Sequence, residues 1–261
     1  MKRSRSKVAA SAPSKTRRNA AAPSVTRHGV ARVMSKLGVC SRTQAAEYVR
    51  AGRVALNGRI VRDPEKPTDA SHDRIALDGR EIHAAERIYL MLNKPRGYVT
   101  TASDEQGRKT VYDLLDGTGL PWTAPVGRLD KASEGLLLLT NDSEWAANIS
   151  APATKVDKIY HVQIDRLPDS ALIDALVLGI DDRGELLSAK SARELRRGDR
   201  NAWLEIVLDE GRNRQIRRLL AAHEVGVLRL VRVAIGPLAL GGLGKGLSRS
   251  LTALEVAAFA R

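Results

Sequence analysis

A loop aspartate is the strongest candidate for chemistry in this sequence. Asp130 ends the segment Gly127-Arg128-Leu129-Asp130, and a polar turn separates it from the apolar run of residues 136–139. A carboxylate at the edge of a buried strand is partly desolvated, which raises its pKa. A nearby cation is then needed to keep the carboxylate ionised and nucleophilic. The alternative is a turn residue that bonds its own backbone.

A cluster of arginines near residue 215 supplies candidates for that cation. If a helix begins near Asn213, then Arg214, Arg217 and Arg218 share one face. One guanidinium can clamp the carboxylate while the others, with Arg212, hold phosphates. The alternative is a solvated basic helix face.

The segment Lys158-Ile159-Tyr160-His161-Val162 is the third candidate element. In a strand, Lys158 and Tyr160 point to the same face. A tyrosine directed into a polar cleft can stack on an extruded base and offer its hydroxyl. An ordinary half-buried strand tyrosine is the alternative.

The net charge of +13 is concentrated at the N-terminus. Residues 1–62 hold 15 of the 43 lysines and arginines but one acid, Glu47, whereas the remaining residues carry 28 bases and 29 acids. Such a footprint suits a polyanion, most often nucleic acid, although solubility alone is an alternative. Residues 1–26 lack acids and are predicted to form a disordered basic tail that contacts RNA, with a targeting segment as the alternative.

Several classes of protein are disfavoured by composition. A single cysteine, Cys40, excludes an intramolecular disulfide and a zinc site built on cysteine pairs, and it favours a reducing, cytoplasmic compartment. The apolar runs are far shorter than a membrane span. The sequence contains no metal-ligand cluster and no glycine-rich phosphate loop, so we expect neither a metal nor another cofactor.

The first 85 residues predict two helices and a small sheet. Helices are expected at residues 30–37 and, after a capping box that begins at Ser41, up to Arg50. Asn57-Gly58 and Asp78-Gly79 predict tight hairpin turns. Residues 32–42 and 52–58 resemble the alpha-L RNA-binding motif of a small-subunit ribosomal protein, over residues 27–85. The basic residues expected to bind RNA in this domain are Arg32, Lys36, Arg42, Arg53 and Arg59.

The remaining residues, 86–261, predict a larger second domain. Strands are expected at residues 88–92, 98–101, 158–164 and 202–208, and helices at 170–178 and 215–223. Because strands and helices do not alternate regularly, we expect an α+β fold with a mixed, mainly antiparallel sheet.

The motifs of this second part occur in an order that resembles one family. Lys94-Pro95-Arg96-Gly97, the run from Gly127 to Asp142, Lys158-Ile159-Tyr160, the run from Arg212 to Leu219, and Ile235-Gly236-Pro237-Leu238 resemble the RsuA/RluB-like ribosomal RNA pseudouridine synthases, over residues 27–261. Two departures affect local loop shape: Ser143 replaces a usual glycine, and Ala151-Pro152 replaces a His-Pro pair.

The resemblance implies a role for each candidate residue. Asp130 would be the essential aspartate, Tyr160 would contact the flipped base and Arg217 would pair with the aspartate. Arg128 would help to extrude or hold the nucleotide. The arginines expected to contact RNA beside it are Arg212, Arg214 and Arg218.

We therefore expect a monomeric enzyme that isomerises a uridine of ribosomal RNA, with large-subunit RNA weakly preferred. The target base must first leave its stack. The aspartate can then act on the anomeric carbon, on the ring or on a sugar proton. A non-catalytic RNA-binding or ribosome-assembly factor is the alternative, but the presence of Asp130, Tyr160 and Arg217 together favours the enzyme. A glycosidase-like hydrolase is a weaker alternative, because the sequence offers no identifiable second acidic partner for Asp130 at a suitable position.

Overall fold

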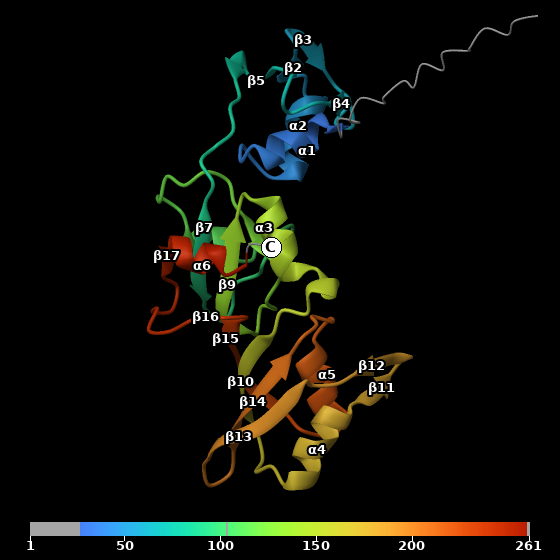
Figure 1. Ribbon diagram of the computed structural model, residues 1–261, viewed down its shortest axis with the longest axis vertical. Helices are drawn as coiled ribbons and strands as arrows, with labels where there is room; N and C mark the ends of the chain where they lie inside the picture. Colours follow the sequence, from blue (N-terminus) through green and yellow to red (C-terminus); the bar gives the residue numbers. More distant parts are fainter. Residues whose placement is uncertain (1–26, 103, 260–261) are drawn as a thin grey trace, which may run out of the picture.

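The computed structural model describes residues 27–102 and 104–259. The tail predicted at residues 1–26 lies outside the described residues. Figure 1 shows a small N-terminal module at one end of an elongated molecule, joined by a single extended segment to a larger body. None of the helices in the described part is long and apolar enough to cross a bilayer.

The N-terminal module consists of two helices and a small antiparallel sheet. Its elements are β1 (His28–Gly29), α1 (Val30–Lys36), α2 (Arg42–Arg50), β2 (Val54–Leu56), β3 (Arg59–Val61), β4 (Pro67–Thr68), β5 (Ile75–Leu77) and β6 (Arg80–Glu81). The sheet has the order β3-β2-β5-β6, and β1 pairs separately with β4. Buried side chains of both helices, including Met34 and Val49, pack with Val54 of β2 in one small core.

The local signals predicted for this module are present. The Ser41 hydroxyl accepts a hydrogen bond from the Gln44 backbone N–H, and the Gln44 side chain accepts one from the Ser41 N–H, which completes the capping box. The two hairpin turns place Asn57-Gly58 and Asp78-Gly79 at positive φ, as tight turns between twisted strands require.

The larger body is built on a nine-stranded sheet in which β13-β14-β10-β15-β9-β7-β17 are neighbours, while β8 pairs with β9 and β16 with β15. Its strands are β7 (Tyr89–Lys94), β8 (Ala124–Val126), β9 (Glu134–Thr140), β10 (Lys158–Ile164), β13 (Ser191–Arg197), β14 (Ala202–Leu208), β15 (Val227–Ile235), β16 (Leu238–Ala239) and β17 (Ser248–Ser250). Among the described strands β9 and β15 form a parallel pair, and the other pairs are antiparallel. The fold is therefore α+β with a mainly antiparallel sheet, as expected.

The helices and short elements of this body pack around the sheet. They are η1 (Val111–Leu114), α3 (Ser143–Ser150), η2 (Pro152–Thr154), α4 (Ser170–Leu178), α5 (Gln215–Ala221) and α6 (Ala253–Ala257), with a separate hairpin of β11 (Ile180–Asp182) and β12 (Glu185–Leu187). Strand β9 is buried on both faces: Leu137 and Leu139 belong to a core shared with α4 and α5, whereas Leu136 and Leu138 pack with Trp145 of α3. This double burial explains its uninterrupted apolar sequence.

One predicted strand, residues 98–101, is wrong. Only an isolated bridge joins Val99 to Thr110. Gly97 is at φ +98° and its N–H donates to the Lys131 carbonyl, while the Thr100 hydroxyl donates to the Leu129 carbonyl. Gly97 and Thr100 therefore bond the loop that contains Asp130, while the backbone of Val99 bonds Lys109 and Val111, and no regular strand forms.

Candidate active site

A pocket of about 320 Å³ brings the sequence candidates of the second domain together. It is lined by the loop after β8, by β10 and β15, and by the segment that leads into α5. Asp130, Tyr160 and Arg217 all line it. Arg128, Arg212 and Arg214 also belong to its lining, whereas Arg218 does not.

A fully buried lysine holds the backbone of the loop that contains Asp130. Lys94, at the end of β7, donates from Nζ to the carbonyls of Pro95, Asp130 and Ser133 at 3.2, 3.0 and 2.8 Å. Burial lowers the pKa of Lys94 to about 8, and the charge of Asp130 opposes that shift. Lys94 therefore explains the lysine of the Lys-Pro-Arg-Gly motif, because it fixes the loop backbone at Asp130 and at Ser133.

The parallel pairing of β9 with β15 brings two backbones close together directly after this loop. Gly135 has φ +102°, and a β-carbon there would overlap with the backbone carbonyl of Arg232. Only glycine fits such an approach without strain. The residue fixes where the loop of Asp130 enters the sheet.

The carboxylate of Asp130 is 38% exposed, which is less burial than the sequence suggested. Its ion pair is with Arg214, at 3.8 Å between Oδ2 and Nη1. The sequence led us to expect Arg217 as the partner of Asp130, but the structure shows Arg214 in that position. Arg214 stands in the left-handed region at φ +50°, one residue before α5, and not on the helical face that the periodicity assumed.

Arg217 instead bonds the backbone of the same loop. Its Nη2 donates to the Ala132 carbonyl at 3.1 Å, and its buried Nε has no hydrogen-bond partner among the described residues. Burial lowers the pKa of the Arg217 guanidinium, the charges of Arg214 and Arg96 lower it further, and Asp130 opposes them. The charge of Arg96 therefore acts on Arg217, and Arg214 and Arg217 both line the pocket beside Asp130.

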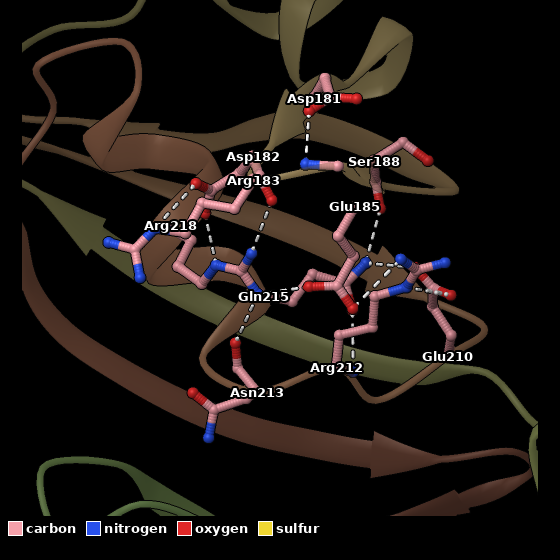
Figure 2. Close-up of polar contacts among 11 residues, drawn as sticks. Asp181, Asp182, Arg183, Glu185, Ser188, Glu210, Arg212, Asn213, Gln215 and Arg218 are labelled. Carbon is pink, nitrogen blue, oxygen red and sulfur yellow. Dashed lines mark hydrogen bonds and ion pairs between the residues drawn. The ribbon is translucent and has the colours of Figure 1, made fainter.

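Two of the four arginines near residue 215 form ion pairs with acids, so phosphate would have to compete with carboxylates for them. Arg218 binds Asp182 and Glu185 at 2.5 and 2.7 Å. Arg212 binds Glu210 at 2.9 Å and the same Glu185 at 3.2 Å. Figure 2 shows these side chains between the β11–β12 hairpin and the start of α5. Arg218 therefore points away from the pocket, because α5 turns it toward the acidic hairpin.

Gln215 holds the loop that precedes α5. It is 2% exposed, and its amide accepts from the Arg212 N–H and donates to the Ser188 carbonyl and the Glu210 carboxylate (Figure 2). The Gln215 amide thus joins the residue after the β11–β12 hairpin, Ser188, to Glu210 and Arg212 of the loop before α5. The conformation that places Arg214 opposite Asp130 is set here.

The inner wall of the pocket consists of β10 and β15. Tyr160 of β10 is 9% exposed and lies opposite Arg232 of β15 in the strand register. Lys158 lines the pocket on the same face of β10, as the alternation of the strand predicts. Lys158, Arg232, Lys94 and Arg96 are not among the site residues expected from the sequence. Lys158 could have been predicted as a pocket residue from the sequence, because it is two residues from Tyr160 in the same strand. The position of Arg232 beside Tyr160 depends on the pairing of β10 with β15, which the sequence does not show.

The basic residues expected to bind RNA in the N-terminal module are exposed, and several have local partners. Arg53 binds Asp78 at 2.6 Å and stacks on Tyr48, Arg42 binds Glu65 at 2.9 Å, and Lys36 contacts His28. Two of these five exposed residues, Arg32 and Arg59, form no ion pair within the described residues.

Comparisons with known proteins agree with this geometry. Residues 88–222 match the family described as RNA pseudouridylate synthase, and residues 30–80 match the S4 domain. The chain is 36% identical over 228 residues to "Ribosomal large subunit pseudouridine synthase B" of Bacillus subtilis, covering 86% of this chain and 92% of the relative. It is also 36% identical over 226 residues to an RNA pseudouridine synthase of Aquifex aeolicus, covering 86% of this chain and 90% of that one.

A solved structure titled "Crystal structure of pseudouridylate synthase" superposes with a TM-score of 0.62 at 30% identity, covering 89% of this chain and all of that chain. An S4 domain followed by a sheet whose pocket presents an aspartate, a tyrosine and arginines defines an RNA-modifying enzyme. The chain belongs to the RNA pseudouridylate synthase family and isomerises uridine to pseudouridine in RNA. The expected family and activity are confirmed.

Proposed function

We propose that this enzyme modifies a uridine of ribosomal RNA, with large-subunit RNA as the preferred substrate and Asp130 as the reacting carboxylate. The observation that carries the proposal is the pocket in which Asp130, Tyr160 and Arg217 meet. The Bacillus subtilis relative, named for the ribosomal large subunit, supports the choice of RNA. S4-domain residues 30–80 supply a second RNA contact.

The reaction begins when the target nucleotide leaves its stack and its base enters the pocket. Tyr160 lies on the inner wall and would contact the base, whereas Asp130 stands in the loop at the mouth, facing the ribose. Lys94 and Arg217 both bond the backbone of that loop, so the carboxylate is positioned before substrate arrives. Arg214 places a positive charge 3.8 Å from the Asp130 carboxylate.

Phosphates are best held by the exposed arginines around the mouth. Arg128 and Arg214 line the pocket and are exposed, and Arg96 interacts electrostatically with Arg217. We retain Arg128 and Arg214 as RNA-binding residues and add Arg96. Arg212 and Arg218 are better explained as structural, because each binds two carboxylates and is less exposed than Arg214.

In the N-terminal module, Arg32, Lys36, Arg42, Arg53 and Arg59 remain the proposed RNA contacts. An ion pair between exposed side chains contributes little stability, so phosphate can displace the carboxylate partner of Arg42 or Arg53 at small cost. We also propose boundaries near residues 27–85 and 86–261, a cytoplasmic location where ribosomal RNA is found, and a monomeric enzyme.

Asp130→Asn tests the proposed chemistry. The variant should form no pseudouridine in unmodified ribosomal RNA transcripts, while its affinity for them stays within about threefold, since the amide keeps the shape but not the charge. Mapping pseudouridine in ribosomal RNA from cells with and without the protein identifies the uridine. Turnover by purified Asp130→Asn would contradict the role of the carboxylate. Modification of small-subunit RNA alone would contradict the preferred substrate.

A further inference from the structure

The inner wall of the pocket contains two positive charges that the roles of Asp130, Tyr160 and Arg217 leave unused. Lys158 of β10 and Arg232 of β15 both line the pocket beside Tyr160. Neither has an ion-pair partner among the described residues. The two nearby acids of the pocket rim, Asp130 and Glu210, pair with arginines of the loop before α5 instead.

Arg232 is held rigidly and has an unsatisfied donor. It is 4% exposed, its Nε donates to the Leu136 carbonyl at 2.8 Å, and its buried Nη2 has no partner among the described residues. A buried donor left without a partner destabilises the folded protein. Such a cost is tolerated where a ligand supplies the missing acceptor.

Lys158 also holds a positive charge in an unfavourable, partly buried position. Burial lowers the pKa of its ammonium and the charge of Arg232 lowers it further, while Asp209 and Asp157 act in the opposite direction. The side chain of Asp157 is already bound by Lys190 at 2.8 Å. Two cations that repel one another on one wall of a pocket are the arrangement expected where negative charge must be received.

We propose that Lys158 and Arg232 form an anion-stabilising wall that holds the negative charge developing on the uracil ring during isomerisation. The proposal rests on the proposed function of this pocket and adds two catalytic residues to it. The ring presents two carbonyl oxygens, O2 and O4, as acceptors for the Lys158 ammonium and the Arg232 guanidinium.

The need for such a wall does not depend on which atom Asp130 attacks. If its carboxylate bonds the anomeric carbon, the electron pair of the N1–C1′ bond stays on the ring. If it removes a sugar proton, the same bond breaks and the ring leaves as an anion. If it adds to C6, the electron pair of the C5–C6 double bond is delocalised toward O4. On every route the N1–C1′ bond is broken and C5 bonds C1′. Asp130 is then released from C1′ or C6, or returns the sugar proton to its carbon. The charge on the ring is lost as the proton on C5 leaves and N1 gains a proton.

A base fits this wall better than a phosphate does. Arg232 is nearly inaccessible and lies beside the buried Tyr160, whereas the arginines at the mouth, Arg128 and Arg214, are exposed. In a flipped nucleotide the base reaches deepest and the phosphates remain at the surface. The inner wall therefore contacts the ring, and the mouth contacts the backbone.

The test compares Lys158→Met, Lys158→Arg and Arg232→Lys in the full chain, under single-turnover conditions with enzyme saturating over unmodified large-subunit RNA transcript. We expect Lys158→Met to slow pseudouridine formation about 100-fold. Lys158→Arg should recover to within about tenfold of wild type, because the charge is restored. Arg232→Lys should slow the step about tenfold, with RNA affinity within about twofold for all three. Lys155→Met is the matched control, because Lys155 is exposed and does not line the pocket.

Thermal melting separates loss of folding from loss of chemistry, and Lys158→Arg keeps the comparison valid if Lys158→Met unfolds. A Lys158→Met rate within about threefold of wild type overturns the proposal. So does a defect confined to RNA affinity, or a Lys158→Arg variant that folds but is as slow as Lys158→Met. A wild-type protein that forms no pseudouridine in this RNA would refute the proposed substrate instead, which is a distinguishable result.

Discussion

At the scale of single residues, the two arginines near Asp130 differ in the strength of their interaction with its loop and in their burial. The pair with Arg214 is 3.8 Å long and both side chains are more than a third exposed, so it is worth about 0–1 kcal/mol. Arg217 is more buried and bonds the backbone beside the aspartate. Its positive charge is therefore less screened, and it has a positioning role that Arg214 lacks.

Arg214→Met and Arg217→Met should consequently differ. We expect Arg214→Met to lower the single-turnover rate less than about fivefold, with most of its effect on RNA affinity. Arg217→Met should lower the rate at least about 100-fold, because it removes a loop contact and a poorly screened charge. The rates are measured at saturating enzyme with unmodified large-subunit RNA transcript. Equal rate defects in the two variants would contradict this ranking.

Lys94 predicts a pH dependence of stability. Its pKa is about 8 in the folded protein against an ordinary value of 10.5, so the folded state binds fewer protons between these pH values. Stability contributed by this group is therefore greatest above pH 10.5 and is lost as the pH falls through 8. A shift of this size corresponds to at most roughly 3 kcal/mol.

The difference in unfolding free energy between wild type and Lys94→Met should accordingly grow in favour of wild type from about pH 8 to about pH 10. Urea denaturation at several pH values measures it. Lys155→Met, with an exposed lysine, should show no such trend. A difference that is independent of pH would mean that Lys94 is not the group that titrates.

At the scale of elements, the acidic β11–β12 hairpin determines where the arginines of the loop before α5 can point. Among the described acids, Glu185 contacts both Arg212 and Arg218, and Gln215 joins the same loop to Ser188 (Figure 2). The hairpin binds Arg212 and Arg218, whereas Arg214 and Arg217 contact the loop of Asp130. The hairpin therefore takes part in positioning although it contains no residue that lines the pocket.

Glu185→Gln tests that positioning. Because its two ion pairs are partly exposed, we expect a loss of about 1 kcal/mol in unfolding free energy. The pseudouridine rate should fall severalfold, because the loop of Arg214 becomes less well fixed. Asp174→Asn, an exposed acid of α4, is the control for removing a charge. Unchanged rate and stability would show that the network holds the loop without Glu185.

At the scale of the whole molecule, the S4 domain is joined to the catalytic part by more than a linker. The Ala85 N–H donates to the Leu37 carbonyl, and the Trp122 N–H donates to the Gly38 carbonyl. Gly38 is at φ +76°, and a β-carbon there would crowd Ala85 and Asn141. These contacts orient the basic module on the body that contains the pocket (Figure 1).

The two parts should therefore contribute separately to RNA affinity and to chemistry. A double variant, Arg32→Gln with Arg59→Gln, should weaken RNA binding and lower the slope of log affinity against log salt by about 0.7–0.9 for each phosphate that the protein no longer neutralises. The single-turnover rate at saturating enzyme should stay unchanged. Arg183→Gln with Arg200→Gln, two exposed arginines of the catalytic part, is the charge-matched control. An unaltered salt slope would contradict RNA contact by this module.

Local signals in the sequence determined much of this protein by themselves. The capping box at Ser41, the Asn-Gly turn at residues 57–58 and the alternation in β10 and β14 depend on neighbours a few residues apart, and all were predictable. The motif around Asp130 likewise identified the family. Such features follow from backbone propensity and side-chain spacing, which the sequence displays directly.

Only the tertiary structure decided which charges meet. Asp130 is paired by Arg214 because the residue before α5 is left-handed, and Arg218 is turned toward a hairpin more than 30 positions earlier. Lys94 and Arg232 reach the site through strand pairing of β7 and β15 with β9. Coulomb energy and burial depend on distances across the fold, and residue spacing along the chain does not fix those distances.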